Sequence, residues 1–247
     1  MLRSLSMALV TSTVLGVLSA APAAAAGTPS GDPKRVAAAV IPGVVYVQSQ
    51  LPDGSIVAGT GMVLTPSGEV LTNYHLVRDE IALGIFDLGD HRVHSAHVVG
   101  GDAAEDIAVV QIEDAHNLRT VRLAQGAAYV GEQVVAVGNG GGKLGEHPGR
   151  ITATGRTLTA QDPEAGPETI HGMLQTDARL TPGDSGGPLV AAEAPDEGRV
   201  VGMDTAGLFR RHGDVQTPVA GYAIPIAHAL AVVARIEDRE SADRHSA

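Results

Sequence analysis

Short apolar runs, broken by turn-forming residues, fill most of the chain after its first 35 residues. Each run has the length of a strand, is rich in β-branched residues and is bounded by Gly, Pro, Asn or Asp. The clearest runs cover 44–47, 61–64, 107–110, 133–137 and 199–202. Their close spacing favours β-barrels or sandwiches over alternating strands and helices, so the pattern predicts an all-β fold.

The last apolar segment has a different period. Residues 225–236 carry apolar side chains at helical spacing behind Pro225, which predicts a C-terminal helix. Residues 237–247 are charged and polar, and we expect a frayed tail there, from about residue 239 onward. The segment 123–129 lies between two sets of predicted strands and is the expected link between two halves of the chain.

The first 26 residues are typical of an export signal. Arg3 gives a positive start, an uncharged apolar stretch covers 5–20, and a run of alanines offers a cleavage site after Ala26. An uncleaved membrane anchor is the alternative, because 4–28 carries no charge and is long enough to span a bilayer. We expect cleavage and a secreted or extracytoplasmic protein, with membrane contact only if the segment stays uncleaved.

The amino-acid composition excludes several classes of core, partner and catalytic site. Apolar residues make up 44% of the 247 residues and aromatic residues only 2%, so the core has to consist of Val, Ile, Leu and Ala. The net charge of −11 would repel phosphate backbones, and we expect no nucleic-acid partner. The chain has no cysteine, which excludes disulfides, a thiol nucleophile and thiolate metal sites.

The strongest chemical signal is the sequence GDSGGPL at 183–189. A nucleophilic serine needs an exposed oxygen on a tight turn and nearby backbone N–H groups that bind the oxyanion. The glycines around Ser185 permit such a turn, and the N–H groups of Gly183 and Ser185 are the expected donors. A plain Gly-rich turn is the alternative. The α/β-hydrolase elbow looks similar but requires the order Ser, acid, His, whereas here the best His and Asp precede the serine.

A base and an acid complete the candidate set. His75 ends a strand-like stretch that begins at Met62, where a rigid element would hold its tautomer. A structural histidine is the alternative. Asp106 stands immediately before a buried strand, where a sheltered carboxylate could orient an imidazole. Asp102 and Glu105 are rival candidates on the residues alone.

Five blocks of the chain, in this order, resemble the trypsin-like serine proteases, specifically the protease domain of HtrA (Deg-type) enzymes. The blocks are VAAAVIPGVVYV (36–47), GTGMVLTPSGEVLTNYHLV (59–77), EDIAVVQI (105–112), LQTDARLTPGDSGGPLV (174–190) and GYAIPI (221–226). The resemblance implies two antiparallel β-barrels, one in 36–125 and one with the C-terminal helix in 126–238, with the site in the cleft between them. Residues 27–35, rich in Gly, Pro and Ser, would be a flexible leader.

The resemblance also implies an activity. It selects Asp106 over its neighbours, because the family's acid directly precedes the apolar strand. With His75 and Ser185 it would form the triad of a serine-type endopeptidase that hydrolyses peptide bonds through an acyl-enzyme and needs no cofactor. The substrates would be polypeptides. Two rivals stay open: a catalytically silent binding protein on the same fold, and an esterase that uses the same triad.

Substrate preference depends on a few positions that the family likeness assigns. It places Thr205, Ala206 and Gly207 along the edge of the primary specificity pocket, and Gly207 leaves that wall open to a larger side chain. Arg179 would lie near the pocket floor and could attract an acidic residue. An exposed loop arginine is the alternative, and Asp204 favours the opposite charge, so specificity stays open.

The chain departs from the HtrA pattern in three ways. HtrA enzymes usually carry a PDZ domain after the protease, and this chain ends too soon to hold one. They usually form trimers through an aromatic N-terminal segment, which is not evident here. They usually have Asn before the serine, whereas Asp184 stands here, as in digestive enzymes whose aspartate pairs with a newly cut N-terminus. A cut after Lys34-Arg35 is therefore conceivable, although the block that begins at Val36 resembles the start of a strand and needs no cut.

Three histidines lie close together in the sequence, His91, His94 and His97. On a strand, alternation would put His91 and His97 on one face and His94 on the other. A shared metal ion is not expected without a supporting acid and open geometry. The sequence therefore predicts no metal site.

Overall fold

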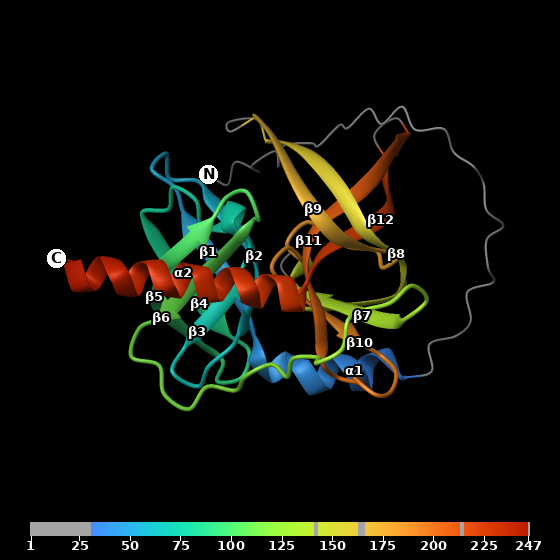
Figure 1. The fold of residues 1–247 in the computed structure, drawn as a ribbon, viewed down its shortest axis with the longest axis horizontal. Coiled ribbons are helices and arrows are strands. Elements are labelled where there is room, and N and C mark those ends of the chain that lie inside the picture. The colour runs from blue at the N-terminus through green and yellow to red at the C-terminus, as the bar shows by residue number, and fades with distance from the viewer. Residues whose placement is uncertain (1–30, 141–142, 163–165, 213–214, 247) are drawn as a thin grey trace.

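The computed structural model describes residues 31–140, 143–162, 166–212 and 215–246. It contains two closed, antiparallel β-barrels of six strands each, which lie side by side (Figure 1). This confirms the prediction of an all-β, two-barrel fold. The predicted signal segment 1–26 lies outside the described residues. Within them, no helix is both long and apolar enough to cross a membrane.

The first barrel follows the order β1-β2-β3-β6-β5-β4 around its circumference. Its strands are β1 Val44–Gln50, β2 Ile56–Val63, β3 Glu69–Thr72, β4 Ala82–Asp87, β5 Arg92–Asp102 and β6 Ile107–Ile112. Alternate side chains of a strand point to one face, and the inward set here includes Val45, Val47, Ile85 and Val110, all buried. The first barrel thus encloses its own aliphatic core.

The second barrel follows the order β10-β11-β12-β9-β8-β7. Its strands are β7 Gln133–Gly138, β8 Gly145–Asp162, β9 Gly166–Thr176, β10 Pro188–Ala191, β11 Val200–His212 and β12 Val215–Pro225. Two long hairpins, β8-β9 and β11-β12, extend beyond the barrel (Figure 1). The aliphatic interior includes Val134, Ala136, Leu174, Leu189 and Val201.

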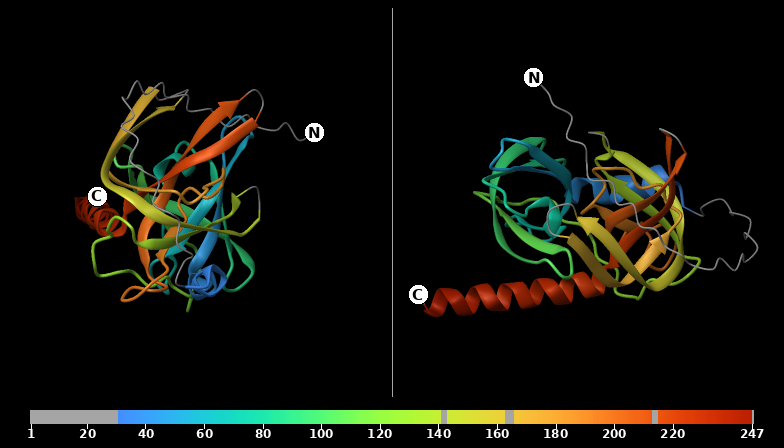
Figure 2. Two further views of the ribbon diagram at one scale, coloured as in Figure 1. Left: turned by 90° about the vertical axis from the view of Figure 1, so that its right-hand side faces the viewer. Right: turned by 90° about the horizontal axis from the view of Figure 1, so that it is seen from above.

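Two terminal helices tie the barrels together. Helix α1, Pro33–Val40, precedes the first barrel but packs against β7, β8 and β10 of the second. Helix α2, Ile226–Ser246, follows the second barrel and packs against β5 and β6 of the first as well as β11 and β12 (Figure 2). Each helix therefore crosses from its own end of the chain to the other barrel.

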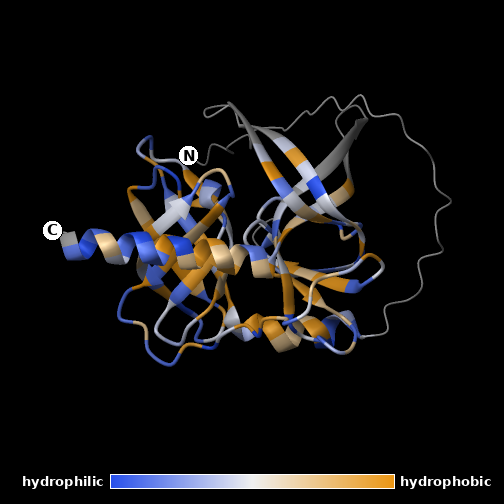
Figure 3. Ribbon diagram, viewed as in Figure 1, coloured by the Kyte–Doolittle hydropathy of each residue, from blue (hydrophilic) through white to orange (hydrophobic). Residues whose placement is uncertain are grey.

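One buried cluster spans both barrels and both helices. It joins Val36 of α1, Met62 and Leu71 of the first barrel, Met203 of the second and Val232 of α2. Figure 3 shows apolar residues along the strands and in the first half of α2, with polar residues towards its C-terminal end. Burial of aliphatic surface, at about 25 cal/mol per Å², thus fixes the barrels against one another without a large aromatic core.

Two segments at the ends of the chain differ from the sequence expectation. Residues 33–40 form α1, although 27–35 was expected to be a flexible leader and 36–47 the start of a strand. Asp32 caps this helix by accepting a hydrogen bond from Lys34 N, and Val36, Ala37 and Val40 become buried. The apolar residues of this segment recur at helical spacing, so it forms a helix and not the strand start that the family resemblance implied.

The C-terminal tail is also helical. The expected fray after residue 236 is wrong, because α2 continues to Ser246. Its polar half is held by contacts with the first barrel, including Arg239 Nη2 at 3.6 Å from Asp102 Oδ2 and Arg235 Nη2 at 3.8 Å from the same oxygen. Arg239, which the sequence placed in the tail, therefore faces an acidic residue of the first barrel.

The contact between α2 and the first barrel also contains an unfavourable pair of carboxyl groups, Glu69 on β3 and Glu237. Burial, with a contribution from Glu237, raises the pKa of Glu69 from 4.5 to about 7. The folded state therefore retains a proton that the unfolded chain loses above its lower pKa. Stability should fall as the pH rises from 4.5 to about 7.

We expect Glu237→Gln to raise the melting temperature at pH 8 by about 1–2 °C, a small gain because solvent screens the pair. At pH 5, where Glu69 is protonated, the substitution should have little effect. Thermal unfolding at both pH values measures this. Asp238→Asn is the matched control on the same helix turn, and an equal gain from both variants would contradict the pairing.

Candidate active site

His75 and Asp106 form a closely bonded pair. His75 lies in a 3-10 turn, Tyr74–Leu76, directly after β3 rather than at the strand end. Its Nδ1 is 2.9 Å from Asp106 Oδ2 and 3.0 Å from Oδ1, and its backbone N–H donates to Oδ1 at 3.0 Å. The side chain of Asp106 is only 4% exposed. A carboxylate only accepts, so the proton of a neutral His75 is on Nδ1 and Nε2 is the basic nitrogen.

The turn before β6 directs Asp106 towards the imidazole. Its backbone φ is 52°, in the left-handed region that Asp tolerates better than most residues. Asn73 Nδ2 donates to the Asp106 carbonyl at 2.9 Å and holds this turn. The two alternative acids have other partners. Glu105 Oε2 lies 2.9 Å from His228 Nε2, and Asp102 lies beside two arginines of α2.

Ser185 lies in the loop between β9 and β10, on the second barrel. It is half-buried, and its Oγ donates to Thr205 O at 3.0 Å. The next residue, Gly186, has a φ of 83° and donates its N–H to Asp204 O at 2.6 Å. A Cβ there would lie 2.0 Å from Thr60 O, so only glycine fits this turn.

Two first-barrel residues that sequence reasoning missed hold the serine loop. Thr60 of β2 donates its N–H to Ser185 O at 2.9 Å, and its Oγ1 donates to Gly183 O at 2.7 Å. Asn73 Nδ2 also donates to Thr205 Oγ1 at 2.9 Å, so it bonds to both barrels. Both residues lie in the block around His75. In the sequence, the only indication of such a role was a polar residue within an otherwise apolar run, because buried polar groups usually have hydrogen-bond partners.

The predicted oxyanion donors lie in this loop. Gly183 has a φ of 104°, and a Cβ there would lie 2.5 Å from Asn139 O. Within the described part of the chain, the N–H groups of Gly183 and Ser185 have no assigned acceptor. The carbonyl groups of the same two residues are fixed by Thr60, so the loop has a fixed conformation while these two N–H groups can bind a ligand.

Asp184 is buried under the loop and bonds within the second barrel. Its Oδ2 accepts from Thr181 N at 2.7 Å and Thr181 Oγ1 at 2.9 Å, and lies 3.3 Å from His147 Nε2 of β8. Val36 lies in α1, where its N–H donates to Asp32 O at 3.0 Å. The Asp184 Oδ2 thus has partners without a new N-terminus, while its buried Oδ1 has no hydrogen-bond partner among the described residues.

Asp204 lies deeper still, on β11. Its side chain is fully buried, and neither carboxyl oxygen has a hydrogen-bond partner among the described residues. Burial, and to a lesser extent the Asp184 carboxylate, raises the pKa of Asp204 well above its ordinary value. The carboxyl group is thus enclosed in the second barrel, and its effect on the charge preference of the pocket stays a prediction.

The predicted pocket residues lie on two segments of the second barrel. Thr205 is buried on β11, Gly207 is half-buried, and the backbone of Ala206 pairs with Tyr222 of β12. Arg179 is exposed and lies in the loop that carries Ser185. In the described ranges no ion-pair partner is assigned to it, so its guanidinium is available to a ligand. Their roles in substrate binding stay predictions.

The comparisons with known proteins give the family. A family model described as a trypsin-like peptidase domain matches residues 59–203, which include all three candidate triad residues. The chain belongs to this family. It is 32% identical over 222 residues to the serine protease PepD of Mycobacterium tuberculosis, covering 85% of this chain and 48% of that one. It is 36% identical over 172 residues to the periplasmic serine endoprotease DegP of Escherichia coli, covering 68% and 33%.

Solved structures agree with this family. The HtrA-type protease AlgW with tripeptide matches with a TM-score of 0.70 and 29% identity, covering 83% of this chain and 63% of that one. The Rv3671c protease of M. tuberculosis in its active form matches with 0.69 and 26%, covering 90% and 94%. The resemblance to HtrA-type proteases is confirmed. The chain spans about half or less of the length of the curated relatives named above.

We expect Asp204→Asn to stabilise the protein at neutral and alkaline pH. The unfolded chain releases the Asp204 proton near pH 3.8 while the folded protein retains it, so the cost of this carboxyl group increases as the pH rises. Asparagine has the same shape and no proton to lose. The gain in unfolding free energy should be about 1–3 kcal/mol at pH 8 and smaller at pH 5, measured by urea denaturation.

Asp184→Asn is the control for this prediction. It replaces one carboxylate oxygen by an amide NH₂, which disturbs the hydrogen bonds from Thr181 or the 3.3 Å contact with His147, and it should destabilise the protein. A gain from Asp204→Asn that is the same at pH 5 and pH 8 would show that the Asp204 carboxyl group ionises normally in the folded protein.

Proposed function

We propose that this protein is a secreted serine endopeptidase that hydrolyses peptide bonds with Ser185, His75 and Asp106 as its catalytic residues. The observation that carries the proposal is the buried Asp106 carboxylate on His75 Nδ1, in a chain of the trypsin-like peptidase family. The loop around Ser185 with two available N–H groups supports it. The curated relatives named above are called a serine protease and a serine endoprotease.

The chemistry follows from the positions of these groups. Ser185 Oγ attacks the carbonyl carbon of the peptide bond while its proton passes to His75 Nε2, and the π electrons of the carbonyl move to its oxygen. The N–H groups of Gly183 and Ser185 bind that oxyanion. The intermediate collapses, the C–N bond breaks, and the amine leaves with the proton from His75. Asp106 stabilises the imidazolium in between.

Water then reverses these steps on the acyl-enzyme. His75 takes a proton from water, the hydroxide attacks the ester carbon, and Ser185 Oγ leaves with the proton. The serine hydroxyl donates to Thr205 O in the structure, so the reaction requires it to turn towards His75. The mechanism needs no cofactor.

Location and substrate preference belong to the same proposal. The export-like segment 1–26 and the word periplasmic in the names of DegP relatives support an extracytoplasmic location. Polypeptides would lie along β11, with Thr205, Ala206 and Gly207 at the pocket edge. The exposed Arg179 supports a preference for an acidic side chain near the cleaved bond.

A fluorophosphonate probe tests the proposal directly. We expect covalent labelling at Ser185, and Ser185→Ala should abolish both labelling and peptide hydrolysis while the fold is retained. Ser241→Ala, at an exposed position on α2, is the matched control. Asp106→Asn keeps the left-handed turn but imposes the wrong tautomer on His75, and it should lower kcat by about 10⁴-fold. An unlabelled wild-type protein would favour a silent binding protein, and turnover of esters without peptides would favour an esterase.

The role of Thr60 gives a further prediction. Thr60→Val removes the hydroxyl that donates to Gly183 O and accepts from Asn139 N, which should misplace the oxyanion donors. We expect kcat to fall about 10–100-fold with a smaller change in KM, because these donors act mainly in the transition state. Thr60→Ser keeps the hydroxyl and should restore most of kcat. A change confined to KM would assign Thr60 to substrate binding instead.

A further inference from the structure

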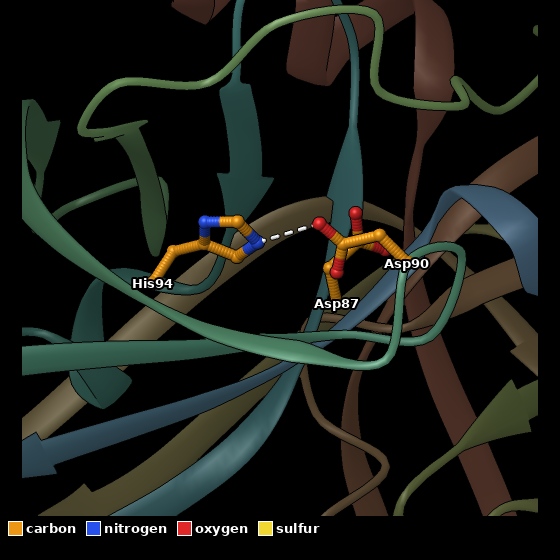
Figure 4. Close-up of side chains that lie close together, drawn as sticks. All are labelled: Asp87, Asp90 and His94. Carbon is orange, nitrogen blue, oxygen red and sulfur yellow. Dashed lines mark hydrogen bonds and ion pairs between the residues drawn. The ribbon is translucent and has the colours of Figure 1, made fainter.

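Two carboxylates and an imidazole meet at the hairpin between β4 and β5. Asp87 ends β4, Asp90 lies in the turn, and His94 is on β5 (Figure 4). One potential ligand atom from each residue lies within 4.8 Å of the other two. Among the described residues, this is the one cluster of at least three metal-binding side chains with such spacing.

The hairpin geometry brings these residues together. Ile85 pairs with His94 and Asp87 pairs with Arg92, so Asp87 and His94 are diagonal neighbours across the two strands. Asp90 Oδ1 accepts from Arg92 N at 2.9 Å, which fixes the turn and leaves Oδ2 to His94. The Asp90 Oδ2 to His94 Nε2 distance is 2.9 Å.

Asp87 lacks a partner for one of its oxygens. The residue is 1% exposed, and its Oδ1 accepts from Gly89 N at 2.7 Å. Its Oδ2 is buried and has no hydrogen-bond partner in the described part of the chain. A buried carboxylate oxygen without a donor is costly, and a bound cation would remove this cost. Burial raises the pKa of Asp87, and the nearby Asp90 carboxylate adds to the rise.

The other two side chains leave the cluster open to solvent. The side chains of His94 and Asp90 are 17% and 33% exposed. An ion bound to His94 and Asp90 would therefore be in contact with solvent on their side of the cluster. The cluster thus combines a buried, unpaired ligand with two accessible ones.

We propose that this hairpin binds one divalent transition-metal ion, best matched by Zn²⁺, through Asp87, Asp90 and His94, with water as a further ligand. Zn²⁺ accepts carboxylate oxygen and imidazole nitrogen, often with three protein ligands and a water. Ca²⁺ requires six to eight oxygen ligands and Mg²⁺ an octahedral oxygen shell, whereas an imidazole ligand favours transition metals.

This site differs from the three-histidine cluster considered in the sequence. His91 lies in the turn with a φ of 59°, and His97 Nδ1 is 3.8 Å from Glu113 Oε1. Of the three histidines, only His94 belongs to a group of three potential ligands among the described residues. The ion would link the end of β4 to β5 and stabilise the first barrel. None of its three ligands bonds to a triad residue among the described contacts, so hydrolysis does not require it.

Calorimetric titration of the metal-free full chain with ZnCl₂ tests the site. We expect one ion per chain and a rise in melting temperature on addition of Zn²⁺, with no comparable binding of MgCl₂ or CaCl₂. His94→Gln should weaken Zn²⁺ binding at least about 10-fold. His97→Gln, three residues further along β5, is the matched control and should bind like the wild type. X-ray absorption should show an oxygen and nitrogen shell at about 2.0–2.1 Å.

Circular dichroism checks that each variant is folded. If His94→Gln does not fold, Asp90→Asn takes its place, because Asp90 is the most exposed ligand. Absence of saturable Zn²⁺ binding, or equal affinity in wild type and both ligand variants, would overturn the proposal. Equal binding of Mg²⁺ would overturn the assignment to a transition metal. His75→Gln distinguishes a Zn²⁺ ion at the triad, since loss of binding in that variant alone would refute the hairpin site.

Discussion

The hydrogen bonds that cross from the first barrel to the serine loop of the second are the constraint on which the site depends. His75 and Asp106 come from one barrel and Ser185 from the other, so the geometry of the site is the geometry of the contact between the barrels. Thr60 and Asn73 make that contact polar and directional. The aliphatic cluster shared by both barrels and both helices keeps it rigid.

Four buried or nearly buried acids show how the surroundings decide what a carboxyl group does. Asp106 has the imidazole and a backbone N–H as partners, and Asp184 has Thr181 and His147. These partners hold the two side chains in place. Asp87, Asp184 and Asp204 each have at least one buried oxygen without a hydrogen-bond partner among the described residues, but only Asp87 belongs to a cluster with two further potential metal ligands. A buried oxygen without a hydrogen-bond partner therefore lowers stability at Asp204 and is a potential ligand at Asp87.

The two terminal helices hold the two barrels together. Each helix buries its apolar face on strands that lie far from it in the sequence, so separating the barrels would expose α1 and α2 as well as the shared core. Carboxyl groups at the docking surface of α2 make this contact sensitive to pH. The proposed catalytic residues lie on these two barrels, which links the stability of the contact to the geometry of the candidate site.

The sequence by itself predicted the all-β class, several of the strands, the C-terminal helix and candidate residues with the chemistry of a serine protease, because periodicity and short motifs are local properties. It left Asp102, Glu105 and Asp106 as alternatives until a family resemblance chose among them. Only the tertiary structure shows that one turn directs Asp106 to His75 while α2 engages the other two acids. The ordered polar half of α2 likewise depends on contacts with a distant segment, the first barrel. Helix α1 and the Asp87 cluster are local in sequence, but the burial of α1 against the second barrel and of Asp87 in the first comes from the tertiary structure.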